Sequence, residues 1–248
     1  MLSLDEHVTI IVPTSPIPSH PSTELIDECV KAIDGCLPEA KLVVLADGIR
    51  DEVSQRSESY QGYLKNLEDG EGVTARRMDV FKSFETHEHQ TRMLRWALTN
   101  EVETPLVLFV EHDTILRADP KIEWERIFDL LLHDKVDVVR FYNWEKAPWH
   151  EHEYLMRGNF IYEDVNFLRT VQFSGWPFIA SSDYLRRLVA SVPEESRTML
   201  EPAVYKQVAN GPWEENRIVI YAPENAQTFY HRDGRLDSET GSKDPGGW

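Results

Sequence analysis

The sequence has few cysteines and no long apolar run, and each shortage excludes a class of protein. Its 248 residues include only two cysteines, Cys29 and Cys36, too few for a disulfide framework or a four-cysteine zinc site. We expect two reduced thiols, with Cys29 in the core. No apolar stretch is long enough to span a membrane. The N-terminus lacks a basic segment followed by an apolar one, so we expect a cytoplasmic protein without membrane insertion.

Basic residues and glycine-rich phosphate loops are also scarce. Lysine and arginine total 26 against 43 aspartates and glutamates, giving a formal net charge of -17. That charge opposes non-specific binding to nucleic acid or to anionic membranes, although a local basic pocket for a phosphate is compatible with it. No G-x-G-x-x-G follows the first apolar segment, and no G-x-x-x-x-G-K-[ST] occurs anywhere. The first absence argues against a dinucleotide-binding fingerprint, and the second excludes a P-loop enzyme.

The most informative stretch runs from Leu106 to Asp113, where five apolar residues are followed by Glu111, His112 and Asp113. An uninterrupted apolar run predicts a strand that is buried on both faces, as in a parallel sheet covered by helices. Ligands of such sheets bind at the carboxyl ends of the strands. Two carboxylates spaced i, i+2 can both reach a hard cation such as Mg²⁺ or Mn²⁺. The alternative is a solvated acidic turn.

The first part of the chain predicts a β-α-β unit. It has strands at 8–12 and 41–46 and an amphipathic helix at 22–34. The residues Pro13, Thr14 and Ser15 begin a proline-stiffened loop that either wraps a nucleotide base or merely turns the chain. Asp47 follows the second strand, where dinucleotide folds place a ribose-binding acid. It could equally cap a turn.

Further elements follow from hydrophobic periodicity. We predict a helix and a surface connection over 50–75, strands near 78–81, 136–141 and 217–221, and helices near 90–98, 122–132, 182–190 and 199–209. Aromatic residues are dense between 142 and 180, which is typical of a surface that stacks sugar rings or bases, or of an irregular second sheet. Residues 236–248 are rich in Gly, Asp and Ser and predict a flexible tail.

The histidines include two His-x-His pairs, His87 with His89 and His150 with His152. Neither pair has the helical H-E-x-x-H spacing of a zinc hydrolase. We therefore expect solvated loop histidines at all four positions.

The order of these pieces resembles the GT-A glycosyltransferases, especially the family-2-like inverting enzymes. The matching segments are 8–14, 46–48, 90–98 and 106–113. The loop at Pro13–Pro16 and the chain length also resemble uncharacterised glycosyltransferase-like proteins of bacteriophages. The resemblance implies an α/β fold of the GT-A type, with a Rossmann-like mixed sheet flanked by helices and a smaller aromatic-rich acceptor-side region. It implies one domain over 1–235, divided into a nucleotide-sugar half (1–113) and an acceptor half (114–235).

The resemblance also implies roles for individual residues. Glu111-His112-Asp113 stands at the D-x-D motif, which holds a metal on the diphosphate of the donor, with Glu in place of the first Asp. Asp113 and a late histidine, His231, are then the expected ligands of Mn²⁺ or Mg²⁺. The expected nucleotide contacts are Pro13, Thr14, Ser15, Asp47, Arg92, Glu111, Arg232 and Arg235.

On the acceptor side, the resemblance points to Glu201 as the catalytic base, at the start of its helix. The family's usual following Asp is replaced by Pro202, and Asp183 and Glu194 are rival candidates. Trp176, in an aromatic loop, is the expected acceptor contact. The implied activity is transfer of a hexose or pentose from a UDP- or GDP-sugar to an acceptor hydroxyl, with inversion at the anomeric carbon.

Two other functions stay open. A catalytically inactive nucleotide- or carbohydrate-binding protein of the same fold would explain the altered first acid and the missing acid after Glu201. A nucleotidyltransferase would use similar carboxylates and a metal, but it normally has a glycine-rich or basic phosphate loop. The acceptor is also open, because a sugar, a lipid-linked carrier, a protein and a modified DNA base all fit the sequence.

Overall fold

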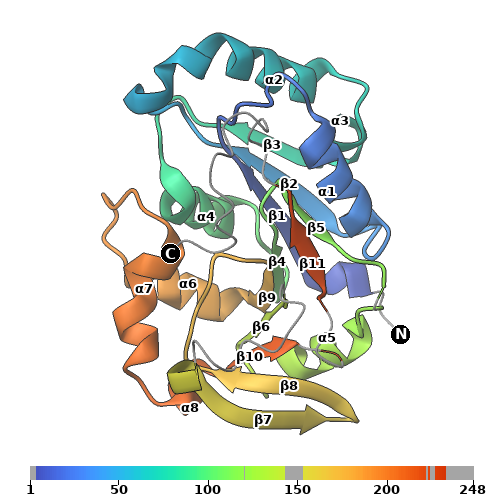
Figure 1. The fold of residues 1–248 in the computed structure, drawn as a ribbon, viewed down its shortest axis with the longest axis vertical. Helices are drawn as coiled ribbons and strands as arrows, with labels where there is room; N and C mark the ends of the chain where they lie inside the picture. Colours follow the sequence, from blue (N-terminus) through green and yellow to red (C-terminus); the bar gives the residue numbers. More distant parts are fainter. Residues whose placement is uncertain (1–3, 120, 143–152, 222, 224–226, 233–248) are drawn as a thin grey trace.

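The computed structural model describes residues 4–119, 121–142, 153–221, 223 and 227–232. Within these ranges a nine-stranded sheet has the order β3-β2-β1-β4-β9-β6-β10-β8-β7, and β11 pairs with β5 in a separate two-stranded sheet (Figure 1). The strands are β1 Val8–Thr14, β2 Lys41–Ala46, β3 Val80–Ser83, β4 Leu106–Phe109, β5 Thr114–Leu116, β6 Val138–Arg140, β7 Met156–Tyr162, β8 Val165–Thr170, β9 Phe178–Ser181, β10 Ile218–Tyr221 and β11 Phe229–His231.

Helices cover both faces of the large sheet. They are α1 Glu24–Asp34, α2 Ser57–Asp69, α3 Val73–Arg77, α4 His89–Asn100, α5 Trp124–Leu132, α6 Ser182–Ala190, α7 Leu200–Ala209 and α8 Trp213–Asn216, with short 3-10 turns η1 Leu4–His7, η2 Asp51–Arg56 and η3 Glu153–Leu155. The buried residues of α1, α2 and α5 share one core cluster, and those of α4, α6 and α7 share the other. The sheet is therefore the middle of three layers.

Side-chain spacing explains this arrangement. In α1 the apolar residues Ile26, Cys29, Val30 and Ile33 recur at intervals of three and four and are all buried, which is the spacing of one helix face. In β4 every residue is buried, because alternate side chains enter the cores on opposite faces. Each fully buried aliphatic side chain contributes about 1.5–3 kcal/mol of hydrophobic stabilisation.

The direction of the strands brings several polar residues to one edge of the sheet. Strands β2, β1 and β4 run parallel, with Thr14 opposite Ala46 and Ile11 opposite Phe109. Antiparallel β9 separates β4 from β6, so β6 again runs in the direction of β4. The carboxyl ends of β1, β2, β4 and β6 consequently lie at the same edge, where ligands of open α/β sheets bind.

The sequence predicts the central elements and misses short ones. The strands expected at 8–12, 41–46 and 217–221 and the helices at 22–34, 122–132, 182–190 and 199–209 are confirmed to within a few residues. The strand expected at 78–81 instead begins at Val80 and ends at Ser83. The sequence does not predict strands β5, β7, β8, β9 and β11, because β5, β9 and β11 are only three or four residues long and the β7–β8 turn lacks glycine.

In the aromatic region from 142 to 180, the structure favours the second of the two alternatives, aromatic residues that pack against a sheet. Tyr142, Phe167, Phe173 and Phe178 are almost completely buried, so these side chains pack the core and do not form a surface for stacking. Tyr154, by contrast, is 65% exposed. The aromatic residues between 143 and 152, the histidines at 150 and 152 and the expected tail at 236–248 lie outside the described residues. No helix of the described part is long and apolar enough to cross a membrane.

Candidate active site at the carboxyl edge of the sheet

The segment after β4 lies beside β11, and this brings together Asp113 and His231, the two expected metal ligands. The backbone N–H of His112 donates to the carbonyl of Pro13 (3.3 Å), so the chain stays beside β1 beyond the last residue of β4. A turn then leads into β5, whose Thr114 lies opposite His231 of β11. This pairing places Nε2 of His231 3.1 Å from Oδ2 of Asp113. Two residues far apart in the sequence are therefore neighbours.

Electrostatics differ between the two carboxylates. Burial raises the pKa of Asp113, but His112 and the hydrogen bond from His231 outweigh burial and leave that pKa below its ordinary value. The pKa of Glu111 is raised to about 7, first by burial, then by Asp113 and Glu201, while His231 acts in the opposite direction. Negative charge is thus poorly compensated around Glu111, and an added cation would stabilise it.

The side chains around Asp113 fit a divalent cation that arrives with a diphosphate. Oδ1 of Asp113 is buried and has no hydrogen-bond partner in the described part of the chain, which leaves a hard oxygen for a ligand. Residues 4–232, apart from those not described, contain no ready cluster of three His, Cys, Asp or Glu side chains that could hold a metal. Phosphate oxygens and water would have to complete the coordination sphere, as they commonly do for Mg²⁺.

Asp47, which follows β2 on the other side of β1, has a different environment. Its carboxylate accepts the backbone N–H groups of Gly48 (2.8 Å), Glu88 (2.7 Å) and His89 (3.2 Å) and lies 2.8 Å from Nδ1 of His87. A Cβ on Gly48 would lie 2.1 Å from the carbonyl carbon of Thr86, so only glycine fits there. Asp47 therefore anchors the segment that leads into α4.

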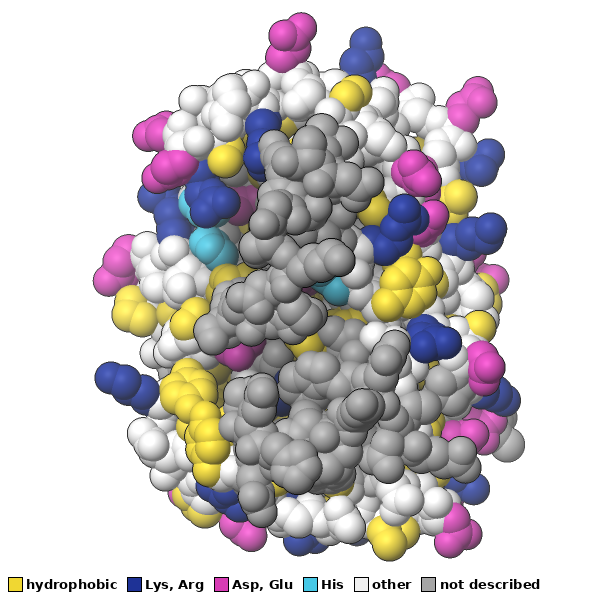
Figure 2. Space-filling view, viewed as in Figure 1, with side chains coloured by type: hydrophobic (Ala, Val, Ile, Leu, Met, Phe, Trp, Pro, Cys, Tyr) yellow, Lys and Arg dark blue, Asp and Glu magenta, His cyan; other side chains and the backbone are white. Residues whose placement is uncertain are grey.

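His87 and His89 are not the solvated loop residues that the sequence predicted. The His87 ring contacts Asp47, and the centroids of the His87 and His89 rings are 5.1 Å apart. The pKa of His89 is lowered, mainly by burial and then by His87, with Arg50 contributing in the same direction. Figure 2 shows histidine side chains beside Lys and Arg side chains on the left of this face, where α4 begins. The expectation failed because spacing alone does not reveal the carboxylate partner.

Strand β1 continues through Pro13 and Thr14, so the loop that the sequence predicts from Pro13 begins only at Ser15. Pro13 and Thr14 are buried and Ser15 is exposed, and the Thr14 hydroxyl lies 2.9 Å from the hydroxyl of Tyr63. His20 stacks on Tyr63 with ring centroids 3.9 Å apart. Burial, and then His112 and Arg56, lower the pKa of His20 to about 3, so this ring is neutral. A stack of neutral rings thus supports the predicted nucleotide loop.

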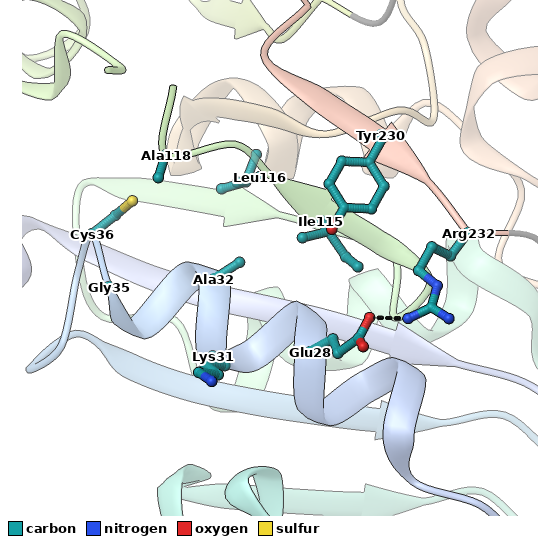
Figure 3. Close-up of a pocket in the computed structure, with 10 residues that line it drawn as sticks. All are labelled: Glu28, Lys31, Ala32, Gly35, Cys36, Ile115, Leu116, Ala118, Tyr230 and Arg232. Carbon is teal, nitrogen blue, oxygen red and sulfur yellow. Dashed lines mark hydrogen bonds and ion pairs between the residues drawn. The ribbon is translucent and has the colours of Figure 1, made fainter. Parts of the chain in front are cut away.

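The predicted basic contacts already have acidic partners. Nε of Arg92 lies 2.7 Å from Oε2 of Glu88. Arg232 pairs with Glu28 of α1, at one end of a cavity of about 580 Å³ between α1 and the β5–β11 pair (Figure 3). To bind a phosphate, either guanidinium would have to break its ion pair with the carboxylate and contact the phosphate instead. Arg235 lies outside the described residues.

Glu201 occupies the first turn of α7, and its Oε2 accepts the backbone N–H of Gly175 (2.9 Å). The next residue, Trp176, is half-buried and packs edge-on against Phe229, with ring centroids 5.5 Å apart. Glu201 interacts electrostatically with Glu111, so the candidate base and the candidate metal site are near each other.

The rival bases are placed differently. The Asp183 side chain is 82% exposed and pairs with Arg186 (3.2 Å). It follows Ser181, which lies opposite Leu106 at the start of β4, and therefore stands at the other edge of the sheet from Glu111. Glu194 is exposed in the turn after α6.

Sequence reasoning missed two polar residues of the site. Gln90 is only 6% exposed, although the helical pattern places it off the apolar stripe of α4. Arg140, at the end of β6, is 4% exposed and donates to the carbonyl of Gln172 (2.9 Å). Burial lowers the pKa of Arg140 to about 10, and Glu201 acts in the opposite direction. A charged residue inside an apolar strand was a usable signal for Arg140, but no local pattern marks Gln90.

The large mixed sheet flanked by helices is the GT-A fold, because glycosyltransferases of that fold match it among solved structures. Residues 1–349 of S. aureus TarS, solved with UDP-GlcNAc, match 96% of this chain with a TM-score of 0.54 at 16% identity. GalNAc-T7, solved with UDP, GalNAc and Mn²⁺, matches 96% with a TM-score of 0.54 at 10% identity. A UDP-glucose pyrophosphorylase complexed with UDP-glucose matches 86% with a TM-score of 0.50 at 12% identity.

These likenesses establish the fold alone. The chain covers 61% of the TarS 1–349 structure, 36% of a longer TarS structure and 45% of GalNAc-T7, so it spans less than two thirds of each of these glycosyltransferases. No family model and no curated protein sequence matches this chain. Any activity must be argued from its own side chains.

Proposed function

We propose that this protein is a metal-dependent glycosyltransferase that moves a sugar from a nucleoside-diphosphate sugar to an acceptor hydroxyl with inversion. The observation that carries the proposal is the contact between Asp113 and His231, beside Glu111 and at the sheet edge where α/β proteins bind ligands. The glycosyltransferase neighbours, one solved with UDP-GlcNAc and another with UDP and Mn²⁺, support the donor class.

On the donor side, Asp113 and His231 would hold Mn²⁺ or Mg²⁺ through Oδ1 and the imidazole. When bound, the ion stabilises the negative charge that develops on the leaving diphosphate, an effect of several kcal/mol. Pro13, Thr14 and Ser15 would contact the nucleoside. Asp47 would act through the loop that it anchors, since its oxygens already accept protein donors.

On the acceptor side, Glu201 would remove the proton of the acceptor hydroxyl. The oxygen then attacks the anomeric carbon from the face opposite the diphosphate, which leaves with the electron pair of the broken bond. One carboxylate suffices, because the leaving group needs no proton, and the configuration inverts. Trp176 would contact the acceptor.

From the sequence we also propose a nucleotide-sugar half (1–113) and an acceptor half (114–235), a hexose or pentose donor and a cytoplasmic location, in a protein that resembles those of bacteriophages. The acceptor stays open. A modified DNA base is the least compatible with the formal net charge of -17, because DNA repels an acidic surface.

Calorimetry tests the donor site. UDP and GDP are titrated into the protein with and without Mn²⁺, and we expect one of them to bind only with the metal. Asp113→Asn should abolish that binding, whereas Asp183→Asn, at the opposite edge of the sheet, should leave it unchanged. If neither nucleotide binds with or without Mn²⁺, the proposed function is wrong.

A second assay separates the enzyme from the alternatives. The sugar nucleotide that raises the melting temperature most is incubated with the protein and Mn²⁺, and release of the nucleoside diphosphate is followed. Binding without release would favour an inactive binding protein, which the absence of a ready metal cluster among the described residues keeps open. Pyrophosphate release from UTP and a sugar 1-phosphate would instead identify a nucleotidyltransferase.

A further inference from the structure

The side-chain amide of Gln90 lies between the candidate metal site and the candidate base. Its Nε2 donates to Oε1 of Glu111 (3.4 Å), and its Oε1 accepts the backbone N–H of Leu200 (2.8 Å). Leu200 is the first residue of α7 and directly precedes Glu201. A single buried side chain of α4 thus bridges the end of β4 and the start of α7.

The loop that Glu201 holds also packs on this amide. The backbone N–H of Gly175 donates to Glu201, and a Cβ on Gly175 would lie 3.5 Å from Nε2 of Gln90. Gln90 therefore adjoins three parts of the site: the carboxyl group of Glu111, the start of α7 and the loop before β9.

The chemistry of the position selects glutamine. A backbone N–H can only donate, so Leu200 fixes the carbonyl oxygen of the Gln90 amide toward α7 and leaves the NH₂ group toward Glu111. An apolar residue at position 90 would leave the buried N–H of Leu200 without an acceptor, and an unpaired buried donor costs about 1–3 kcal/mol. Glutamate would keep the bond to Leu200, but it would lose the donor to Glu111 and add a second negative charge there.

We propose that Gln90 is a positioning residue that fixes the base Glu201 relative to the donor site through Leu200 and Glu111. The inference rests on the proposed function and deepens it, because transfer requires the acceptor oxygen and the anomeric carbon to be held in line. A displacement of about 1 Å between such groups can cost about a hundredfold in rate.

The adjacent residue provides a matched control. Thr91 also joins α4 to the segment before α7, through Oγ1 to the carbonyl of Ser196 (3.0 Å) and from its backbone N–H to the carbonyl of Thr198 (3.1 Å). Its side-chain hydrogen bonds go to Ser196 and Thr198 and not to Glu111 or Glu201. Thr91→Val therefore weakens the contact between α4 and the segment before α7 without changing the bonds that Gln90 makes.

The experiment compares wild type with Gln90→Met, Gln90→Glu and Thr91→Val. Calorimetry gives the Kd of UDP with Mn²⁺, and hydrolysis of UDP-GlcNAc or of the better donor from the screen, with water as acceptor, gives kcat and KM. For Gln90→Met we expect kcat to fall about tenfold to a hundredfold, with Kd and KM within about threefold. Thr91→Val should keep kcat within about threefold.

Gln90→Glu keeps the bond to Leu200 and so guards against a variant that simply fails to fold. We expect its kcat to fall as far as that of Gln90→Met, because the hydrogen bond to Glu111 is lost. Equal losses of kcat in Gln90→Met and Thr91→Val, or wild-type kcat in Gln90→Glu, would overturn the inference alone. A wild-type protein that binds no nucleotide, or that binds a donor without consuming it, would instead refute the proposed function, and the inference with it.

Discussion

The strands on either side of β1 are each followed by a buried acid, and the two acids differ in how many donors the chain gives them. After β2, the Asp47 carboxylate accepts three backbone N–H groups and contacts His87. After β4, Asp113 contacts His231 through one oxygen, and its other oxygen has no hydrogen-bond partner in the described chain. The protein supplies hydrogen-bond donors to both oxygens of the first acid and leaves one oxygen of the second without a donor.

The contrast shows how to separate an anchoring carboxylate from a ligand-binding one. Both acids follow apolar strands at the same edge of the sheet, so position alone does not distinguish them. The number of donors that the folded chain provides does, because a buried carboxylate without donors is costly unless a cation or substrate pairs with it. Four predictions test this contrast, from the largest expected effect to the smallest.

The largest effect is expected for Asp47→Ala. It removes the acceptor for the N–H groups of Gly48, Glu88 and His89, so the free energy of unfolding should fall by about 3–5 kcal/mol. Asp113→Ala should cost less than about 1 kcal/mol, because the wild-type carboxylate is incompletely paired. Urea denaturation with EDTA present measures both. Equal losses would remove the distinction between the two acids.

His231→Ala tests the incomplete site directly. If His231 is a ligand, we expect the Mn²⁺-dependent Kd for UDP to rise by about tenfold or more, with little change in melting temperature, because this side chain is 48% exposed. Tyr230→Ala is the control, since successive side chains of a strand point to opposite faces. Calorimetry with both variants decides, and the same Kd in both would exclude a metal-binding role for His231.

Glu111→Gln should change stability in a pH-dependent way. The folded-state pKa of Glu111, about 7, lies above its ordinary value of 4.5, so the folded state binds this proton more tightly than the unfolded chain. The stability gained from this more tightly bound proton is fully present below pH 4.5 and is lost as the pH rises through 7. The substitution should therefore raise the melting temperature by several degrees at pH 8 but hardly at pH 4.5, measured with EDTA. The same change at both pH values would contradict the shifted pKa.

Arg232→Ala should have the smallest effect. Its guanidinium pairs with Glu28, and both side chains are substantially exposed, so we expect less than about 0.5 kcal/mol in stability. To contact the nucleotide as the sequence predicts, Arg232 must give up its ion pair with Glu28, which offsets part of the gain. The Kd for UDP with Mn²⁺ should therefore rise by only about twofold to threefold in the variant. A much larger rise in this Kd would show that Arg232 leaves Glu28 completely and pairs with the phosphate when UDP binds.

Much of the fold could be predicted because the signal was local. The apolar run before Glu111 and the stripe of α1 reflect burial within a few residues. The β7–β8 hairpin was missed because its turn uses Glu163 and Asp164 at φ of 45° and 68°, positions that Gly or Asn more often occupies. Strands of three residues, such as β5 and β11, are too short to show periodicity.

The candidate site could be predicted only in part, because its connections are between distant segments. The strand that precedes Asp113 indicates this residue as a candidate, the resemblance implies His231, and the structure brings the two side chains into contact. Two features depend on tertiary contacts. The segment before α4 donates hydrogen bonds to Asp47, and the side chain of Gln90 connects α4 to α7. No spacing along the chain encodes them.

The separate pairing of β11 with β5 has a consequence for amide hydrogen exchange. In the described chain, His231 is carried by a two-stranded ribbon and not by the nine-stranded sheet, and such ribbons are marginally stable without support. Backbone amides of Thr114–Leu116 and Phe229–His231 should thus exchange together, and faster than those of β1. A nucleoside diphosphate bound with Mn²⁺ between Asp113 and His231 would slow both segments at once, since it would join one strand of the ribbon to the other.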